Sequence, residues 1–305
     1  MVLNYYFFLI IIFFNSKKII GRNISHLINN HLSEIYLTIK GSGEQKICNI
    51  EPSVVIANGI YRNDCNRACN LDNEENNITL IFNKTIKSCY NMFANLMNIT
   101  KVDLSNFDAS LVYNMGYMFN NATNLENVNF GNINTSSLKS MIALFQYCYN
   151  LISIDLSNFD TSQVTNMGWM FSYCQKLEII NLGSINTSSV KSMKSLFQCC
   201  YELISFDLSN FDTSQVTDMN RMFNECHNIE IINFGNINTS SLKSMLALFQ
   251  YCYKLTSIDL SNFDTSQVTD MAWMFYDCRN LKYANLSFFD ASNIYRIHKM
   301  FGNCN

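Results

Sequence analysis

The chain has 305 residues, of which 48% are hydrophobic and 15% are charged, and its formal net charge at pH 7 is −3. This length and apolar content allow a sizeable core. The low, slightly negative charge excludes the basic footprint of a nucleic-acid-binding protein.

The N-terminus begins with an apolar run from Val2 to Phe14, followed by Lys17 and Lys18. A run of this length is typical of the core of a secretory signal peptide and is short for a membrane span. We therefore predict a signal peptide over residues 1–22 and an extracellular or cell-surface location. The alternatives are an uncleaved signal anchor that tethers the protein to the membrane, and a buried strand.

Residues 23–76 contain no repeat. Within them, residues 35–50 predict a strand, a glycine turn and a second strand. A stack of coils needs its open end covered by a segment with a polar outer face. We interpret residues 23–76 as a small N-terminal β cap with this role.

From residue 77 onward the chain repeats every 26 residues, in two alternating forms. The string Asp-Leu-Ser-Asn-Phe-Asp begins at Asp103, Asp155, Asp207 and Asp259, and a related asparagine-rich string lies midway between these copies. A fixed period in the twenties is the signature of a solenoid. We predict about nine stacked coils over residues 77–305, each stabilised by its neighbours.

Each coil combines two spacings of apolar residues. Residues 151–156 follow the pattern Leu-x-x-Ile-x-Leu, whose end alternates as in a strand. In residues 164–174 the apolar positions are spaced by three, three, one and three, which predicts a short helix or helical turn. The segment between them is rich in turn-forming Asn, Asp, Thr and Ser. The predicted fold class is therefore α/β: a solenoid of parallel strands and short helices or turns behind the β cap.

The stretch from Leu151 to Cys174 resembles the BspA-type leucine-rich repeat. It follows the form FDTSxVTxMxxMFxxC, which is common in surface proteins of mycoplasmas, Gram-positive bacteria and some protists. The resemblance covers about residues 77–305, and it is specific because the motif recurs in register. It implies a right-handed leucine-rich-repeat solenoid on the cell surface that acts in adhesion or recognition.

The cysteines fall into two groups. In an exported protein we expect a disulfide among Cys48, Cys65 and Cys69 of the cap; a metal pair at Cys65 and Cys69 is the weaker alternative, because no histidine lies nearby. The repeats place seven further cysteines in one column, the cysteine column: Cys148, Cys174, Cys200, Cys226, Cys252, Cys278 and Cys304. We interpret these as buried free thiols rather than disulfides, since side chains of one column point the same way.

Another column alternates aspartate and asparagine: Asp103, Asn129, Asp155, Asn181, Asp207, Asn233, Asp259 and Asn285. Its oxygens are of the type that calcium prefers, but we interpret it as a solvated strand face, and we predict no metal and no other cofactor. Asn134, Asn186 and Asn238 begin Asn-x-Ser sequons on one turn of the even coils. They are the candidate glycosylation sites if the source is eukaryotic.

Two columns vary too much in size and charge to belong to the core, so we predict that they are exposed. The tryptophan column holds Tyr117, Trp169, Arg221 and Trp273 in odd coils, with Ala143, Ser195, Ala247 and Lys299 in even coils. The tyrosine column holds Thr123, Tyr149, Gln175, Tyr201, His227, Tyr253 and Arg279. Exposed aromatic residues and arginine are the usual anchors of protein interfaces, although drift on a free surface explains the variation equally well.

Catalysis finds no support, because the four histidines are scattered and no nucleophile or phosphate-binding motif occurs. We therefore predict a non-enzymatic binding or adhesion module with protein or glycan ligands. The alternative is a structural coat protein that self-associates side by side. We also expect association through the C-terminal coil, whose apolar columns continue to the end of the sequence.

Overall fold

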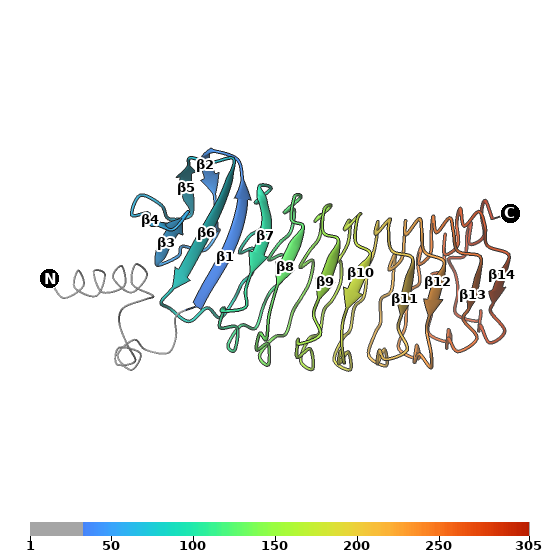
Figure 1. Cartoon of the computed structure of the whole chain (residues 1–305). Coiled ribbons are helices and arrows are strands. Elements are labelled where there is room, and N and C mark those ends of the chain that lie inside the picture. Colours follow the sequence, from blue (N-terminus) through green and yellow to red (C-terminus); the bar gives the residue numbers. More distant parts are fainter. Residues whose placement is uncertain (1–32, 305) are drawn as a thin grey trace.

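The computed structural model describes residues 33–304, which form a β cap followed by a rod of stacked coils (Figure 1). Every regular element in this part of the chain is a strand. Residues 33–304 contain no helix that is long and apolar enough to cross a membrane. The predicted signal peptide at residues 1–22 and the start of the predicted cap lie outside the described residues.

The cap is built from six strands: β1 (Ser33–Lys40), β2 (Gly43–Lys46), β3 (Val54–Ala57), β4 (Ile60–Tyr61), β5 (Ala68–Leu71) and β6 (Glu75–Phe82). Strand β1 alternates buried and half-buried residues, with Ile35, Leu37 and Ile39 in the core. The strand order is β4-β3-β6-β1-β7-β8, so one sheet joins the cap to the first two coils. The antiparallel pairing of β1 with β7 marks the change from cap to solenoid.

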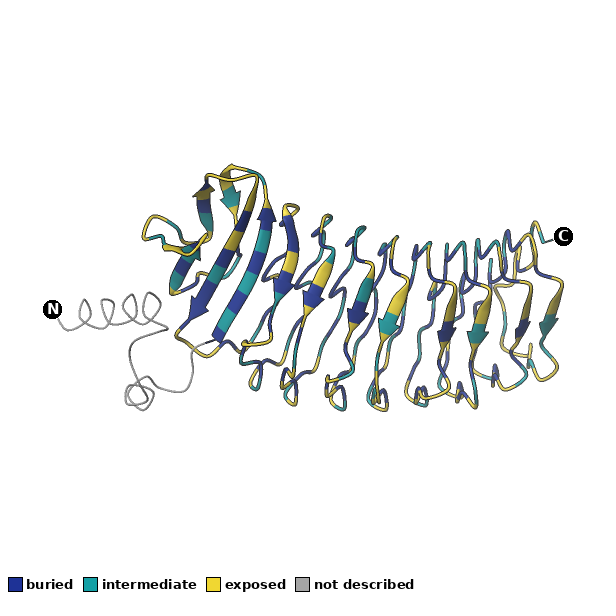
Figure 2. Cartoon of the chain, viewed as in Figure 1, coloured by how far each residue is buried: buried dark blue, intermediate teal, exposed yellow. Residues whose placement is uncertain are grey.

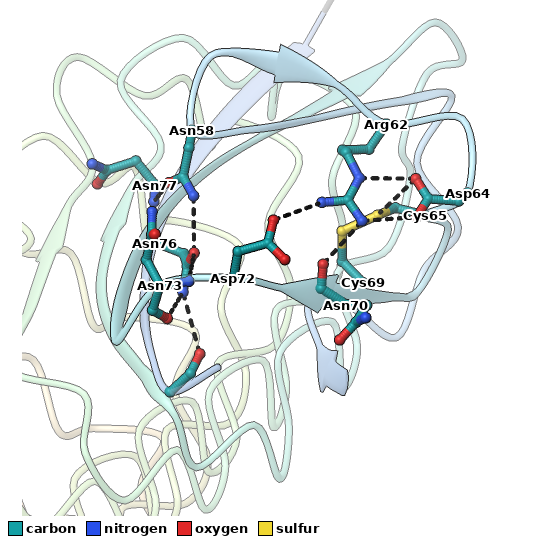
Figure 3. Close-up of polar contacts among 11 residues, drawn as sticks. Asn58, Arg62, Asp64, Cys65, Cys69, Asn70, Asp72, Asn73, Asn76 and Asn77 are labelled. Atoms are coloured by element: carbon teal, nitrogen blue, oxygen red, sulfur yellow. Dashed lines mark hydrogen bonds and ion pairs between the residues drawn. A yellow bond between two sulfur atoms is a disulfide. The ribbon is translucent and has the colours of Figure 1, made fainter. Parts of the chain in front are cut away.

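Polar contacts hold the outer part of the cap together (Figure 3). The Arg62 guanidinium donates two hydrogen bonds to Asp64, at 2.9 and 2.7 Å, and one to the carbonyl of Asn70. A disulfide joins Cys65 to Cys69 in the same region. Cys48, the third cysteine of the cap, is a buried free thiol.

One side of the solenoid, the strand face, carries eight short strands: β7 (Ile99–Asp103), β8 (Asn127–Asn129), β9 (Ser153–Asp155), β10 (Ile179–Asn181), β11 (Ser205–Asp207), β12 (Ile231–Asn233), β13 (Ser257–Asp259) and β14 (Tyr283–Asn285). They pair in parallel and in register, as in Ile154 opposite Ile180. Pairing occurs within the couples β7–β8, β9–β10, β11–β12 and β13–β14. Among the described strands, no ladder joins one couple to the next.

The opposite side, the turn face, is formed by consecutive turns, so the predicted short helices are wrong, and with them the α/β fold class: the described residues form a β-solenoid. In residues 167–174, the N–H groups of Met170, Ser172 and Cys174 bond to carbonyls three residues earlier, while those of Trp169, Phe171 and Tyr173 bond to the next coil. Helices pack about 8–10 Å apart. Direct bonding brings successive coils much closer than that, and the rings of Phe145 and Phe171 lie 5.8 Å apart. A turn that leaves alternate N–H groups free for the next coil satisfies this spacing, whereas a helix uses them internally.

Left-handed residues make this path possible. Trp169 and Tyr173 have φ values of 56° and 64°, and the equivalent residues of the other described coils share this conformation. The carbonyls and N–H groups of alternate peptide units therefore point along the rod. At the cap, the Asn49 N–H donates to the carbonyl of Met92 at 2.8 Å, and the Asn49 side chain donates to that of Ala94 at 3.0 Å. Asn49 thus occupies the place of a preceding coil.

The core is a set of stacked columns, and its buried residues recur at the same places in each coil (Figure 2). A phenylalanine column runs the length of the rod with ring centroids 5.2–6.1 Å apart: Phe93, Phe119, Phe145, Phe171, Phe197, Phe223, Phe249, Phe275 and Phe301. Stacked pairs of this kind contribute about 0.5–1.5 kcal/mol each beyond burial. The cysteine column lies beside it and consists of free thiols, which are buried in every case except the half-buried Cys304, so the interpretation is confirmed for the other six.

Side-chain hydrogen bonds explain several repeated residues. The Cys174 thiol lies 3.1 Å from the carbonyl of Phe145 in the preceding coil, and the other six cysteines of the column repeat this contact. At the corners, Asp155, Asp160 and Asn166 each accept the N–H of the residue two positions later, at 2.8, 3.0 and 2.8 Å. Such Asx turns let a short polar side chain replace a backbone partner. The side chains of the Asp/Asn column therefore accept the hydrogen bonds that close the corner turn after each strand.

Candidate binding surface

The tryptophan column lies on the turn face, at the first left-handed position of each coil. Tyr117, Trp169, Arg221 and Trp273 have φ values of 55–56°. Arg221 is exposed, but the three aromatic residues are half-buried. The small members Ala143, Ser195 and Ala247 are buried, so the prediction that the whole column is exposed is wrong for these three even coils, whereas Lys299 of the last even coil is exposed.

Neighbouring side chains cover the two indole rings. The Lys194 Nζ lies 5.2 Å from the centroid of Trp169, close enough for a cation–π interaction. The ring of His298 meets Trp273 edge to face, with centroids 4.3 Å apart. The tryptophans thus form two separate, partly covered anchors rather than one open strip.

The tyrosine column is more continuous. The rings of Tyr201 and His227 stack at 4.5 Å, and those of His227 and Tyr253 stack at 4.7 Å. The Arg279 guanidinium lies 4.7 Å from the centroid of Tyr253 and is held by two hydrogen bonds to Asp277. Four successive coils therefore present one stack of planar groups, half-buried along its length and exposed at Arg279.

A second row of tyrosines lies beside this stack. Tyr147 contacts Tyr149 of the tyrosine column at 6.2 Å between centroids, and Tyr251 contacts Tyr253 at the same distance. Tyr147 and Tyr173 of adjacent coils lie 4.9 Å apart. Tyr149 therefore belongs to the same aromatic surface, which we call the tyrosine surface and define as Tyr147, Tyr149, Tyr173, Tyr201, His227, Tyr251, Tyr253 and Arg279. The second row was missed at the sequence level, although its aromatic residues recur in one column.

Burial favours the neutral forms of three groups at the centre of the tyrosine surface, Cys199, Tyr201 and His227. Burial, together with the nearby Cys199 and Glu225, raises the pKa of the Tyr201 phenol to about 12. Burial raises the pKa of the Cys199 thiol to about 12, and Glu225 acts in the same direction. Burial lowers the pKa of His227. The neutral phenols can exchange hydrogen bonds with a ligand, whereas the Cys199 thiol is fully buried.

The remaining predicted sites lie elsewhere. Asn134, Asn186 and Asn238 are exposed corner residues whose Oδ1 atoms accept the N–H of the serine two positions later, at 3.1 Å in each case. Within residues 33–304, no group of three or more His, Cys, Asp or Glu side chains is arranged to hold a metal ion. A shallow hollow of about 510 Å³ lies on the sheet that joins cap and solenoid, and Tyr36, Lys101 and Asp103 line it.

The sequence interpretation missed one surface altogether. Four isoleucines of the strand face are exposed to solvent: Ile152, Ile179, Ile204 and Ile231. The signal for Ile179 and Ile231 was available, because residues 178–181 and 230–233 read Glu-Ile-Ile-Asn where the odd coils end in Ser-Ile-Asp or Ser-Phe-Asp. The strand period turns Ile180 and Ile232 toward the core, where they are half-buried, and leaves Ile179 and Ile231 outside.

Known proteins were compared with the chain. A family model described as "Mycoplasma protein of unknown function, DUF285" matches residues 87–206 and again residues 192–305. Among solved structures, the chain is similar to a leucine-rich repeat protein from Bacteroides ovatus, with 20% sequence identity, a TM-score of 0.34, and coverage of 74% of this chain and 69% of that chain. No curated protein matched. The family match confirms the recognition of BspA-type repeats.

Proposed function

Since the two family matches together span residues 87–305, the chain belongs to the DUF285 repeat family of mycoplasma-type proteins, and we propose that it is an exported, non-catalytic binding module. The observation that carries this proposal is the tyrosine surface, where Tyr201, His227, Tyr253 and Arg279 of four successive coils form one partly exposed stack. Tyrosine and arginine are enriched among the residues that dominate binding energy at protein interfaces.

The geometry of the stack favours a protein ligand over a glycan. A sugar ring packs against the face of an aromatic ring, but the faces of His227 and Tyr253 are already covered by their neighbours in the column. What these residues offer outward is their edges, with hydroxyl and imidazole groups that donate and accept hydrogen bonds. Such edges suit the backbone and polar side chains of a protein.

The location belongs to the same proposal. An apolar N-terminal run, a surface-type repeat family and a disulfide in the cap support export to the cell surface. Cleavage of residues 1–22, or their retention as a membrane anchor, is decided by mass spectrometry of the protein recovered from its own cells.

Binding is tested with purified matrix proteins, namely collagen, fibronectin and laminin, and with a glycan array. The informative variant is Tyr201→Gln with His227→Gln and Tyr253→Gln, because Gln175 already occupies the same column and the fold accepts it. Tyr113→Thr is the matched control: Tyr113 is an exposed tyrosine of another column, where other coils carry Thr165, Thr217 and Thr269.

We expect the wild type and the control to bind one of the matrix proteins and the triple variant to lose at least about tenfold in affinity. Binding that is limited to glycans, or that the triple variant retains, contradicts the proposal. Sedimentation without ligand tests the coat-protein alternative, since a coat protein that packs side by side forms ever larger assemblies with rising concentration, whereas a binding module that associates only through its C-terminal coil stops at a dimer.

A further inference from the structure

Positive charge gathers on the half of the turn face that runs from the corner to the tryptophan column. We call this half the basic band, and define it as the eight residues of each coil that end at that column: 84–91, 110–117, 136–143, 162–169, 188–195, 214–221, 240–247, 266–273 and 292–299. The band holds nine of the 21 lysine and arginine residues of the chain but only two of its 24 aspartate and glutamate residues. A chain whose formal net charge is −3 therefore has one strongly positive surface.

The charges of the basic band face solvent, and the protein leaves most of them without a counter-charge. Eight of the nine basic side chains are exposed: Lys84, Lys87, Lys139, Lys191, Arg221, Lys243, Arg296 and Lys299. Within residues 33–304, only Arg296 of these eight forms an ion pair, at 2.9 Å with Asp270. The ninth, Lys194, lies over Trp169, and the second acid, Asp218, is half-buried and accepts the N–H of Asn220. Exposed cations without an internal partner attract an anionic ligand.

The other acids of the coils lie outside the band. The corner residues Asp160, Asp212 and Asp264 each accept the N–H of a serine of their own coil. Asp155 and Glu178 are exposed on the strand face, on the other side of the rod. This separation of charge directs a polyanion to the basic band.

Three lysines of the band form a row along the rod. Lys139, Lys191 and Lys243 occupy one column in alternate coils, and backbone pairing in this column is unbroken. From Lys139 to Thr269, the N–H of each member donates to the carbonyl of the preceding coil at 2.9–3.0 Å. Two coils span about 9.6 Å at the usual distance between strands, so the three lysines extend over about 19 Å. A row of cations parallel to the rod fits a linear polyanion better than a compact anion.

Threonines occupy the same column between the lysines. The hydroxyls of Thr165, Thr217 and Thr269 donate to the carbonyls of the preceding lysines at 3.4, 3.2 and 3.2 Å. Because these hydrogens are already used, the hydroxyl oxygens can only accept a hydrogen bond from a ligand, whereas the lysine ammonium groups can only donate. The column therefore suits a ligand that carries anionic groups together with hydroxyl groups, as an anionic polysaccharide does.

Two other polyanionic partners fit the band less well. A single-stranded nucleic acid stacks its bases on a platform of aromatic rings. Trp169 and Trp273, at the edge of the band, are four coils apart, and Lys194 and His298 partly cover them. A membrane surface takes up exposed apolar side chains. In the six coils between residues 136 and 273, the band presents no large exposed apolar side chain.

We propose that the basic band binds a sulfated polysaccharide that runs along the rod. Its sulfate groups lie against Lys139, Lys191 and Lys243, and its sugar hydroxyls donate to the threonines between them. Lysine acts as a compact point charge, whereas the planar fork of arginine is the group that matches a carboxylate, so a row of lysines favours sulfate. The band is separate from the tyrosine surface, so each proposal can fail independently of the other.

The test uses the purified protein and fluorescently labelled heparin. Fluorescence anisotropy should show binding that weakens as the salt concentration rises from about 0.05 M to about 0.5 M. Three other polyanions serve as comparisons: hyaluronan, which has carboxylates but no sulfates; oligothymidylate, which has phosphates but only terminal hydroxyls; and vesicles of phosphatidylserine and phosphatidylcholine. Each should bind at least about tenfold more weakly than heparin.

The informative variant combines Lys139→Thr, Lys191→Thr and Lys243→Thr. It copies the odd coils, where threonine occupies this column, so the fold accepts the substitutions. Removing three charges from the band should lower the affinity for heparin at least about tenfold.

The matched control removes the same charge outside the band. Lys176→Asn and Lys254→Asn copy the asparagines of their column, Asn150 and Asn228, and Lys282→Thr copies Thr256. All three lysines are exposed, as the lysines of the row are. This variant should bind heparin as the wild type does.

Unchanged melting temperatures establish that both variants fold. Equal affinity of the band variant and the wild type for heparin overturns the proposal. An equal loss in the control variant overturns it as well, because net charge rather than the band then governs binding. Binding of hyaluronan, oligothymidylate or the vesicles as tight as that of heparin shows that a sulfated polysaccharide is not the ligand.

Discussion

The turn face and the strand face of the solenoid differ in how continuously the backbone of one coil pairs with that of the next. On the turn face a parallel ladder runs through all nine coils without interruption, from Ser88 to Arg296. On the strand face the ladder is broken after β8, β10 and β12. The core is uneven behind the strand face, where Ile180 and Ile232 behind β10 and β12 are only half-buried, whereas Ile154 and Ile258 behind β9 and β13 are buried, as are Phe171 and Phe197 of the turn face.

This difference means that the two faces contribute unequally to holding the coils in register. Continuous hydrogen bonding and the phenylalanine column fix the register of the coils on the turn face. The strand face contributes less to fixing the register, because only two neighbouring coils at a time pair there. Its outward positions can therefore vary between serine and isoleucine without loss of register.

The largest expected effect comes from the phenylalanine column. Phe197→Ala should destabilise the protein by about 3–5 kcal/mol, because it leaves a cavity between two stacked rings. Ile180→Ala, on the strand side, should cost less, about 1–2 kcal/mol, since the side chain is half-buried. Urea denaturation followed by circular dichroism measures both. Equal losses in the two variants would remove the asymmetry between the faces.

A glycine of the even coils tests the pairing of the strands. Gly183 has a φ of +53°, and a Cβ atom there would lie 2.8 Å from the Cα and Cβ atoms of Ser157 in the preceding coil. Gly183→Ala should therefore push β10 away from β9 and cost about 1–3 kcal/mol. Gly168→Ala is the control: its Cβ would lie 3.1 Å from the Asn166 side chain, and no left-handed φ is involved. A Gly183 variant as stable as this control would show that pairing within the strand couples contributes little to the stability of the fold.

Much of this architecture could be predicted from the sequence. The 26-residue period predicts a solenoid, the repeated apolar columns predict its core, and the cysteine column reads correctly as buried thiols. These predictions succeed because each position is seen in several coils, and a position that stays apolar in every coil has to lie in the core. The strand–turn–strand pattern near residue 40 likewise appears as β1 and β2.

The predicted helices were wrong because two structures share one spacing. Consecutive turns bring residues three and four apart to the same side, as an α-helix does, so Val164, Met167, Met170 and Phe171 fit both. The distinguishing feature is the left-handed conformation of Trp169 and Tyr173, which cannot be predicted from residue type because neither Trp nor Tyr favours a positive φ. The breaks between strand couples depend on packing between coils that a single repeat does not encode.

The left-handed positions provide the next test of the turn face. Arg221 is exposed and has a φ of 56°, so its substitution changes backbone strain more than packing. Arg221→Val should destabilise the protein by about 1–2 kcal/mol, because a β-branched residue tolerates this conformation poorly. Arg221→Gly should leave the melting temperature unchanged or slightly higher. If valine and glycine behave alike, the turns are not held in the left-handed conformation that the continuous ladder requires.

The smallest expected effect is a dependence on pH at the corners of the odd coils. Hydrogen bonds from Ser162 lower the pKa of Asp160, and serines two positions on do the same for Asp212 and Asp264. A folded-state pKa below the unfolded value of about 3.9 means that ionisation stabilises the fold above pH 4, and that this contribution is lost as the pH falls through the folded-state pKa. The even coils have Asn134, Asn186 and Asn238 at the same corners, with the same hydrogen bond but no charge to titrate. Replacing the three aspartates by asparagine should therefore lower the melting temperature slightly at pH 7 and bring the two proteins together near pH 2.5. Differential scanning calorimetry across this range measures the convergence. A constant difference at every pH would show that the aspartates act only as hydrogen-bond acceptors, which asparagine replaces.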